Sequence, residues 1–449
     1  MLAAYAVDLR FDDLPEPVVN QAIQIIRDTF GAMLAGSTLP EVRYLAQLAP
    51  SFGGIGSATL IGHGQTSTPH FAALVNGTAG VSLELDEGNQ YAVNHPAVHL
   101  LPAVWALAET QEVSGKELLT AFIAGYEIAV RVGQATHLRD PVHPFGTHAV
   151  IGTAAAAARL MKLSTEHTSR ALDLAAGLTL ASSQTAANSG ASVRNLFTGF
   201  TNHNGLLAPA LVVAGFTGEP DALKIVYGRI LGDSFAEGDL GHDLGKMYYI
   251  TRNYFKLHAC SRWNHAPIEA AAALLEKFPV AVEDVAAITV WTYSPATRLS
   301  GRGVHNGYAA KHSIPYNVAA RIVYNANDLT VYLDEAVHDS RVQALMQKIQ
   351  VVEDPALTAL LPDLRPARVE IRLESGQVLT ETVTQPRGGF DNPFSEAELL
   401  TKFRTLAGMA LSPDAIRQIE NLLPTLPRLR DLSPLSVLLR RKSTIKERK

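Results

Sequence analysis

The sequence predicts a mainly α-helical protein with an inserted α+β domain. Over residues 15–275, apolar side chains recur with the 3.6-residue period of an amphipathic helix, and the same pattern returns after residue 394. Between these regions, four short segments are instead typical of half-buried strands, with apolar residues at every second position. We therefore expect a discontinuous all-helical domain, residues 1–270 and 394–449, interrupted by a smaller α+β domain, residues 271–393.

The first predicted helix runs from Pro15 to Leu34, where an apolar stripe includes Val19, Ile26 and Phe30. The same periodicity predicts further helices at 69–84, 100–112, 115–137, 149–162, 166–187, 202–215, 264–277, 395–408 and 412–423. The helix at 149–162 contains only small residues between 152 and 158. Because small side chains let neighbouring helices approach closely, we expect this helix to be buried on several sides.

The α+β domain is predicted from its strands. We expect strands at 285–293, 348–353, 367–373 and 378–383, with helices at 313–324 and 338–347 between them. The sequence Glu374-Ser375-Gly376-Gln377 separates the last two strands and is typical of a hairpin turn. The glycine and proline residues of Pro386-Arg387-Gly388-Gly389 then mark the return to helix.

The composition excludes several classes of protein. Of 449 residues, 47% are hydrophobic and 18% are charged, with a net charge of −5, which excludes a disordered chain and offers nucleic acid no basic face. The single cysteine, Cys260, leaves no intrachain disulfide and indicates a reducing compartment. We find no transmembrane stretch and no signal peptide, so we expect a cytoplasmic protein with no membrane partner. The basic tail after Arg440 is expected to be a solvated chain end.

The candidate chemical groups lie in or beside loops that lead into helices. They are His95, His99, His143, His148, Arg194, His203, Lys256, His258, Arg262 and His265. The sequence has no HExxH motif and no cysteine pair, so we expect no metal. It also lacks a GxSxG elbow and the glycine-rich nucleotide motifs, which argues against a serine nucleophile and a nucleotide cofactor. Histidines with lysine and arginine suit proton transfer on a substrate that carries carboxylates.

A series of longer motifs follows the chain from one end to the other. In order they are Asp28-Thr-Phe-Gly31-Ala-Met-Leu-Ala-Gly36, Leu85-Asp86-Glu87-Gly88-Asn89 with His95-Pro96-Ala97, His143-Pro-Phe-Gly-Thr-His148, His203-Asn204-Gly205, Gly215-Phe-Thr-Gly-Glu-Pro220, Lys256-Leu-His-Ala-Cys-Ser-Arg262-Trp-Asn-His265, Ser313-Ile-Pro-Tyr316 and Pro386-Arg-Gly-Gly389. Through these motifs the chain resembles the MmgE/PrpD family over nearly its whole length. That family includes 2-methylcitrate dehydratase, cis-aconitate decarboxylase and iminodisuccinate epimerase.

The resemblance implies a cofactor-free homodimer in which the α+β domain is a lid over an active site in the cleft between the domains. It also implies catalytic residues. His143 matches a histidine near the substrate and would be the general acid or base, while Lys256 would bind a substrate carboxylate or stabilise an enolate-like transition state. His95 or Asp86 would supply the second member of an acid–base pair.

Other matching positions are expected to bind the substrate. Arg194 stands where many relatives carry lysine, and its guanidinium can grip a carboxylate with two hydrogen bonds. Arg262 would either bind a carboxylate or brace its own loop, and the sequence leaves both roles open. The remaining candidates are Glu84, Asn89 and His148.

One motif departs from the family pattern. Dehydratase and decarboxylase relatives usually have Asp-x-Asp-Asp-Thr before the His-Pro pair, whereas this chain has Glu84-Leu85-Asp86-Glu87-Gly88. Because a shift near 1 Å costs on the order of a hundredfold in rate, the departure leaves the substrate open.

By resemblance we expect a lyase that removes a proton next to a carboxylate of a small di- or tricarboxylate. The first expectation is a hydro-lyase similar to 2-methylcitrate dehydratase. The alternatives are, in order, an epimerase of an iminodisuccinate-like dicarboxylate, a cis-aconitate-type decarboxylase and a non-catalytic carboxylate-binding protein.

Overall fold

The computed structural model describes residues 1–440, so the basic tail after Arg440 lies outside the described residues. The chain divides into two compact units. Among the described residues, unit 1 contains Met1–Ser183, Arg194–Tyr254 and residues 395–440, and unit 2 contains Gln184–Val193 and Phe255–Phe394. Unit 2 therefore begins before the expected boundary at 271 and includes a short outlying segment. Over residues 1–440, no helix combines the length and the apolar character that crossing a bilayer requires.

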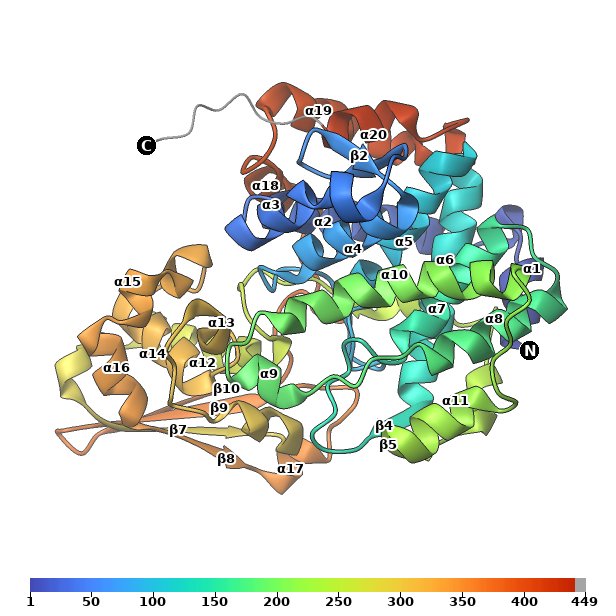
Figure 1. Ribbon diagram of the computed structural model, residues 1–449. Helices are drawn as coiled ribbons and strands as arrows, with labels where there is room; N and C mark the ends of the chain where they lie inside the picture. The colour runs from blue at the N-terminus through green and yellow to red at the C-terminus, as the bar shows by residue number, and fades with distance from the viewer. Residues whose placement is uncertain (441–449) are drawn as a thin grey trace. The chain divides into compact units, whose positions relative to one another are not determined.

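Unit 1 is a helical assembly (Figure 1). Its helices are α1 (Leu2–Asp8), α2 (Glu16–Gly36), α3 (Pro40–Gln47), α4 (Pro69–Val81), α5 (Pro96–Gln111), α6 (Gly115–Ala135), α7 (Ala149–Leu160), α8 (Thr165–Gly177), α10 (Val193–Val213), α11 (Ala222–Ile225), α18 (Glu396–Ala407), α19 (Pro413–Leu422) and α20 (Ser433–Arg440). Helix α18, near the end of the chain, packs against α2 near its beginning. The expected discontinuous helical fold is therefore confirmed.

Helix α7 is buried on several sides, as its small residues predict. It packs against α5, α6 and α8, and its alanines from Ala154 to Ala158 have no exposed surface. A Cβ atom added at Gly152 would collide with the backbone oxygen of Gly125 on α6, and one added at Gly125 would approach the backbone oxygen of Gly152. The two glycines thus allow α6 and α7 to approach to backbone contact.

Helix α10 differs from the prediction, because it begins at Val193 and not at residue 202. Asn202 lies in its interior, where its amide repairs a break in α5: Pro102 has no N–H to bond the Val98 oxygen, and Asn202 Nδ2 donates to that oxygen at 2.9 Å. Gly205 does not open a helix either. A Cβ there would collide with Thr153 on α7, so this glycine serves packing.

Other helix boundaries also differ. The helix expected at 166–187 is two helices, α8 and α9 (Gln184–Asn188), and α5 begins four residues earlier than predicted. Helices α1, α3, α11 and α20 were not predicted, because their apolar stripes are short.

Unit 2 is built on a four-stranded sheet with the order β10-β9-β7-β8. The strands are β7 (Val285–Thr292), β8 (Ile349–Glu353), β9 (Ala367–Leu373) and β10 (Val378–Val383), which confirms the four predicted strands and the hairpin. Strands β7 and β8 are parallel, and the connection between them carries α14 (Ile314–Tyr324) and α16 (Ser340–Gln347). These helices and α12 (His265–Lys277) cover the same face of the sheet (Figure 1).

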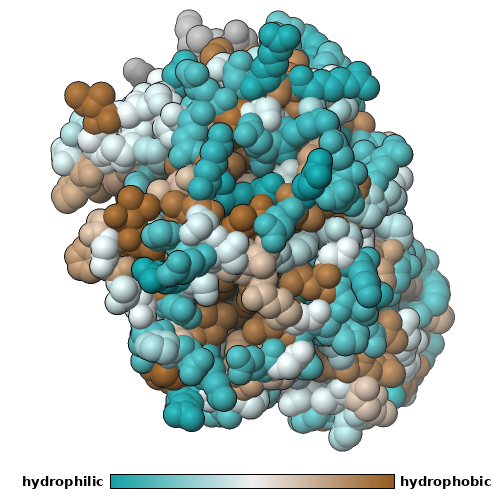
Figure 2. Space-filling view, turned by 90° about the vertical axis from the view of Figure 1, so that its right-hand side faces the viewer, coloured by the Kyte–Doolittle hydropathy of each residue, from teal (hydrophilic) through white to brown (hydrophobic). Residues whose placement is uncertain are grey.

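The surface agrees with an ordinary globular composition. On the face shown in Figure 2, hydrophobic side chains are interspersed with hydrophilic ones. In unit 1, Phe52 and Ile55 are among the most exposed large apolar residues.

Candidate active site

The expected acidic residues lie on the loop that joins α4 to α5, residues 82–95, which we call the acid loop. Glu84 has a left-handed backbone conformation (φ +58°), which costs a non-glycine residue about 1–2 kcal/mol. The two-residue strands β3 (Gly88–Asn89) and β6 (Asn253–Tyr254) pair and hold the loop from the other side. The side chains of Asp86, Glu87 and Asn89 are completely buried.

Asp86 and His95 form a buried hydrogen-bonded pair at the end of this loop. His95 is the N-cap residue of α5, and its Nδ1 lies 2.5 Å from Asp86 Oδ2. Since a carboxylate only accepts hydrogen bonds, Nδ1 carries the proton, and Nε2 is the nitrogen that can take up or release one. Tyr254 Oη lies 3.3 Å from that Nε2.

Gly88 makes room for Tyr254. A Cβ at Gly88 would collide with the phenol ring and hydroxyl of Tyr254. Relatives usually carry threonine at this point of the acidic motif, so in this chain a tyrosine hydroxyl from a distant segment approaches the place where a threonine side chain would begin.

His143 is held in the opposite tautomer. The backbone N–H of Phe145 donates to His143 Nδ1 at 2.9 Å. A nitrogen that accepts a hydrogen bond cannot carry a proton, so neutral His143 has its proton on Nε2. Its backbone is fixed by two hydrogen bonds with Ser182, one through the N–H and one through the oxygen. The side chain therefore presents a donor.

The Phe145 ring brings the expected residues of unit 1 together. Its centroid lies 4.8 Å from the His95 ring, 4.9 Å from the His143 ring and 4.6 Å from the His99 ring. The guanidinium of Arg194, at the start of α10, stacks 4.1 Å from the same centroid. Phe145 is itself buried, so it sets the spacing of these four side chains.

Arg194 forms a buried ion pair with Glu84. Both side chains have less than one-tenth of their surface exposed. Breaking such a pair costs about 3–5 kcal/mol, because it leaves one buried charge uncompensated. Among residues 1–440, Arg194 Nε is buried without a hydrogen-bond partner, so the guanidinium keeps one donor for a further acceptor.

Glu87 and Asn89 point into the protein. Tyr126 Oη donates to Glu87 Oε1 at 2.5 Å, and the Ala97 N–H donates to Glu87 Oε2 at 3.3 Å. Burial raises the pKa of Glu87 from 4.5 to about 8. Asn89 bonds the Tyr249 oxygen with its amide and accepts from backbone N–H groups of its own loop. Its hydrogen bonds thus hold the loop in place.

His148 and His99 are buried neutral histidines. His148 has a protein partner at each ring nitrogen, Asn94 at Nε2 (3.1 Å) and Thr147 at Nδ1 (3.2 Å). Burial lowers the pKa of His148 to about 4 and that of His99 to about 3. Neither imidazole is suited to take up a second proton near neutral pH.

Lys256 and Arg262 belong to unit 2. The Lys256 side chain has no exposed surface and lies close enough to His265 for its charge to lower the pKa of that histidine. Arg262 donates to the backbone oxygens of Pro386 (2.8 Å) and Arg387 (2.6 Å). Of the two roles that the sequence left open for Arg262, these contacts are those of a residue that braces its loop.

A group of possible metal ligands also lies in unit 2, where donor atoms of His258, His265 and Glu269 lie within 4.8 Å of one another. The set fits a cation poorly. Arg262 Nη1 lies 3.2 Å from His265 Nδ1, and after burial the Arg262 charge is a further cause of the low pKa of His265. Both oxygens of Glu269 accept from the Arg387 N–H. The expectation of no metal therefore stays a prediction.

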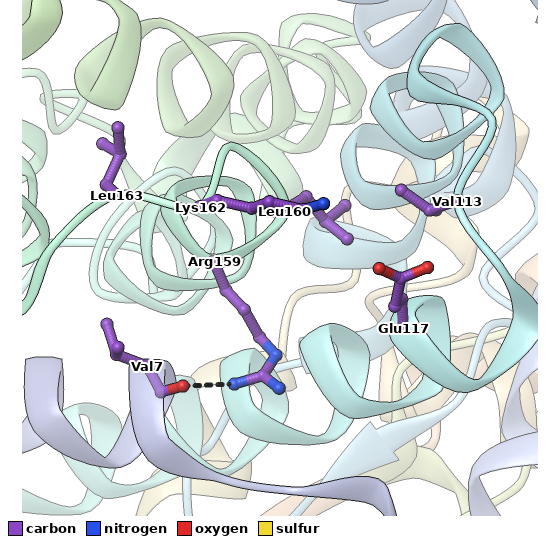
Figure 3. Close-up of a pocket in the computed structure, with 7 residues that line it drawn as sticks. All are labelled: Val7, Val113, Glu117, Arg159, Leu160, Lys162 and Leu163. Carbon is purple, nitrogen blue, oxygen red and sulfur yellow. Dashed lines mark hydrogen bonds between the residues drawn. The ribbon is translucent and has the colours of Figure 1, made fainter.

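A pocket of about 310 Å³ lies elsewhere in unit 1 (Figure 3) and is lined by Val7, Val113, Glu117, Arg159, Leu160, Lys162 and Leu163. None of the expected site residues lines it. Arg159 donates to the backbone oxygens of Ala6, Val7 and Leu9, so its guanidinium binds the carbonyl groups at the C-terminal end of α1.

Two residues of the site, Tyr254 and Phe145, could not be recognised from the sequence. Tyr254 lies two residues before Lys256, but no spacing rule connects it with His95. Phe145 lies inside the His143–His148 motif, yet an apolar residue in a motif of histidines gives no sign that rings pack around it.

A hydrogen-bonded Asp–His pair beside a histidine fixed as a donor is an arrangement typical of proton-transfer sites. Comparison with known families agrees with the sequence motifs. Residues 1–235 match the MmgE/PrpD N-terminal domain, and residues 258–425 match the MmgE/PrpD C-terminal domain. The chain belongs to the MmgE/PrpD family.

Individual relatives are similar over different lengths. A cis-aconitate decarboxylase-like protein of Aspergillus oryzae is 28% identical over 98% of this chain and 96% of its own length. The cis-aconitate decarboxylase of Aspergillus terreus is 28% identical over 97% of this chain and 94% of its own. The 2-methylcitrate dehydratase of Escherichia coli is 26% identical over 54% of this chain and 52% of its own.

Proposed function

We propose that this protein is a cofactor-free lyase that acts on a small di- or tricarboxylate. The observation that carries the proposal is the contrast between two histidines on the same phenylalanine ring. His95 is paired with Asp86 and can carry a proton on Nε2, whereas the Phe145 N–H holds His143 as a neutral donor.

The two histidines have different roles in this proposal. Asp86 stabilises the imidazolium form of His95, so His95 is the residue that gives a proton to, or takes one from, the substrate. His143 would be a poor general acid, because loss of its only ring proton would leave an imidazolate. A neutral imidazole can still polarise a substrate oxygen through a hydrogen bond. His143 therefore stabilises negative charge as it develops on a carboxylate.

One proton carrier and one neutral donor favour decarboxylation as the first candidate reaction. The bond between the substrate and its carboxylate carbon breaks, carbon dioxide leaves, and the electron pair forms a carbanion that the hydrogen bonds of the site stabilise. His95 then delivers its Nε2 proton to carbon. Similarity to two cis-aconitate decarboxylase relatives over nearly their whole length supports the same reaction.

Dehydration is the second candidate, and the partial similarity to 2-methylcitrate dehydratase supports it. His95 would take the proton next to a carboxylate and return it to the departing hydroxyl, so that water leaves and a double bond forms. Epimerisation needs two bases on opposite faces of the substrate, and neutral His143 with its occupied Nδ1 is not suited to be the second one.

Charged groups support an anionic substrate. Arg194 has a buried Nε donor on the guanidinium that stacks against Phe145, and this donor suits a carboxylate oxygen. The family resemblance assigns Lys256 a role with a carboxylate as well, and its complete burial is unusual for a lysine without a function.

Proton NMR in deuterated water tests the proposal. The purified protein is incubated with cis-aconitate, 2-methylcitrate, citrate, malate and iminodisuccinate, and released carbon dioxide is measured in parallel. Carbon dioxide with deuterium in the product supports decarboxylation, and a new vinyl signal without carbon dioxide supports dehydration. Loss of a signal without a new product would favour epimerisation, and no change with any substrate in a folded protein would contradict the proposal for this substrate panel.

A further inference from the structure

Lys402 is a buried lysine that connects the end of the chain with the acid loop. It lies on α18, and only 4% of its side chain is exposed. Its ammonium lies 2.6 Å from Asp28 Oδ1 on α2 and donates to the backbone oxygen of Leu85 at 2.7 Å. One cation thus joins three segments of unit 1 that are far apart in the sequence.

The backbone oxygen that Lys402 holds belongs to the residue between the two acids of the site. Glu84, on one side, has the left-handed conformation and pairs with Arg194. Asp86, on the other side, pairs with His95. The orientation of the Leu85–Asp86 peptide therefore decides where the Asp86 carboxylate lies.

We propose that Lys402 is a positioning residue for the Asp86–His95 pair. By holding the Leu85 oxygen, its ammonium fixes the peptide plane that leads into Asp86 and keeps the carboxylate 2.5 Å from His95 Nδ1. Asp28 holds this ammonium in place from the other side, with its Oδ1 2.6 Å from Nζ.

The alternative is that Lys402 and Asp28 form only a structural ion pair between α2 and α18. The two roles differ in one testable respect. A buried ion pair can be replaced by neutral residues with little loss of stability, whereas a single missing partner is costly. Replacing both residues removes the ion pair without leaving a single buried charge uncompensated. It does not restore a hydrogen-bond donor to the Leu85 oxygen.

The experiment compares Lys402→Met, Lys402→Arg and the double variant Asp28→Asn/Lys402→Met with the unchanged protein. We expect Lys402→Met to lower the thermal midpoint and the double variant to recover most of it. Turnover should stay reduced in the double variant, on the order of a hundredfold, because the carboxylate is no longer held. Lys402→Arg keeps the charge and the donors and should recover part of the turnover. The double variant should also shift the limb of the pH–rate profile that His95 produces, which a purely structural pair would leave in place.

Arg27→Met is the matched control. Arg27 lies next to Asp28 on α2 and forms an ion pair with Glu396 on α18, 2.7 Å away. This variant removes an α2–α18 ion pair without affecting the contact between Lys402 and Leu85, and we expect unchanged turnover. A double variant with full turnover and an unshifted pH profile would overturn the proposal.

A second readout needs no substrate, so it remains valid if the proposed function fails. With ¹⁵N-labelled histidine, the His95 Nδ1 proton should give a downfield signal that disappears in Asp86→Asn. We expect this signal to weaken or shift in the double variant and to stay in Arg27→Met. An unchanged signal in the double variant would contradict the positioning role whatever reaction the protein catalyses.

Discussion

His95 and His143 pack against the same Phe145 ring, but their Nδ1 atoms have opposite hydrogen-bond roles. His95 Nδ1 donates to Asp86 at 2.5 Å, and His143 Nδ1 accepts from the Phe145 N–H at 2.9 Å. Two side chains of the same type therefore offer two chemistries around one aromatic ring. This contrast is the basis for the first prediction.

Glutamine substitutions should separate the two roles. A glutamine amide can donate a hydrogen bond but cannot carry a proton, so His143→Gln should keep at least about tenfold more turnover than His143→Ala. At position 95, both substitutions should reduce turnover by a factor on the order of 10³, because general acid–base catalysis contributes roughly 10²–10⁴-fold. Steady-state kinetics of the four variants with the substrate found by NMR makes the comparison.

If His143→Gln is as inactive as His143→Ala while His95→Gln stays active, then His143 is the proton carrier and the roles are reversed. His148→Ala is the control, because both nitrogens of His148 bond within the protein. It should affect stability far more than turnover.

Lys256→Met should lower turnover by orders of magnitude and leave unit 2 folded. The substitution keeps an unbranched chain of similar length in a fully buried position and removes the charge together with the hydrogen-bond donors of the ammonium. Circular dichroism and the thermal midpoint would verify folding, and kinetics would measure the loss. Near-normal turnover would remove Lys256 from the site.

The contribution of Glu87 to the stability of unit 1 should fall as pH rises from about 4.5 to about 8. Burial raises the pKa of Glu87 to about 8, so over this range the unfolded chain releases the proton that the folded protein keeps. The Glu87 contribution to the free energy of unfolding therefore decreases with rising pH. The decrease ends above about pH 8, where the carboxyl is ionised in both the folded and the unfolded protein. Glu87→Gln cannot ionise but keeps groups that can bond Tyr126 and the Ala97 N–H.

The measurement is the thermal midpoint of both proteins between pH 5 and pH 8. We expect the thermal midpoint of Glu87→Gln to rise relative to that of the unchanged protein as the pH increases. A constant difference across the range would show that Glu87 does not change its protonation between folded and unfolded states.

Gly152→Ala should destabilise unit 1 by more than about 2 kcal/mol, because the added carbon would collide with the backbone of α6. Gly177→Ala, at the end of α8, is the matched control. An added Cβ there meets no atom of residues 1–440 within 4 Å, and alanine favours helix by about 1 kcal/mol over glycine. The denaturant midpoint should fall in Gly152→Ala and rise in Gly177→Ala. Equal midpoints for the two variants would contradict the close approach of α6 and α7.

Elements with strong periodicity could be predicted closely from the sequence. Strands β9 and β10 begin and end at the predicted residues, because alternation and a turn signal define both ends. Helix α10 could not be placed in the same way. Asn202 and Gly205 look like residues that open a helix, and only the neighbouring Pro102 and Thr153 explain why they lie inside one.

The candidate site shows the same limit. The sequence motifs placed Asp86, His95 and His143 as candidates, but the tautomer of His143 depends on one backbone N–H and could not be predicted. Lys402, between a threonine and a phenylalanine on a helix with polar positions, looks like an ordinary surface lysine. Its contact with Leu85 spans 317 residues, and no local pattern reports a contact of that range.

The order of synthesis gives this long-range contact a consequence for how the protein is made. Helices α2 and α4 leave the ribosome early, but α18 follows only after unit 2 has been translated. At roughly 5–20 residues per second, the acid loop waits on the order of 15–60 s for Lys402. Nascent chains in this interval, and fragments cut before residue 395, lack the lysine that holds the Leu85 oxygen, so under the proposal their Asp86 and His95 are not yet fixed in place.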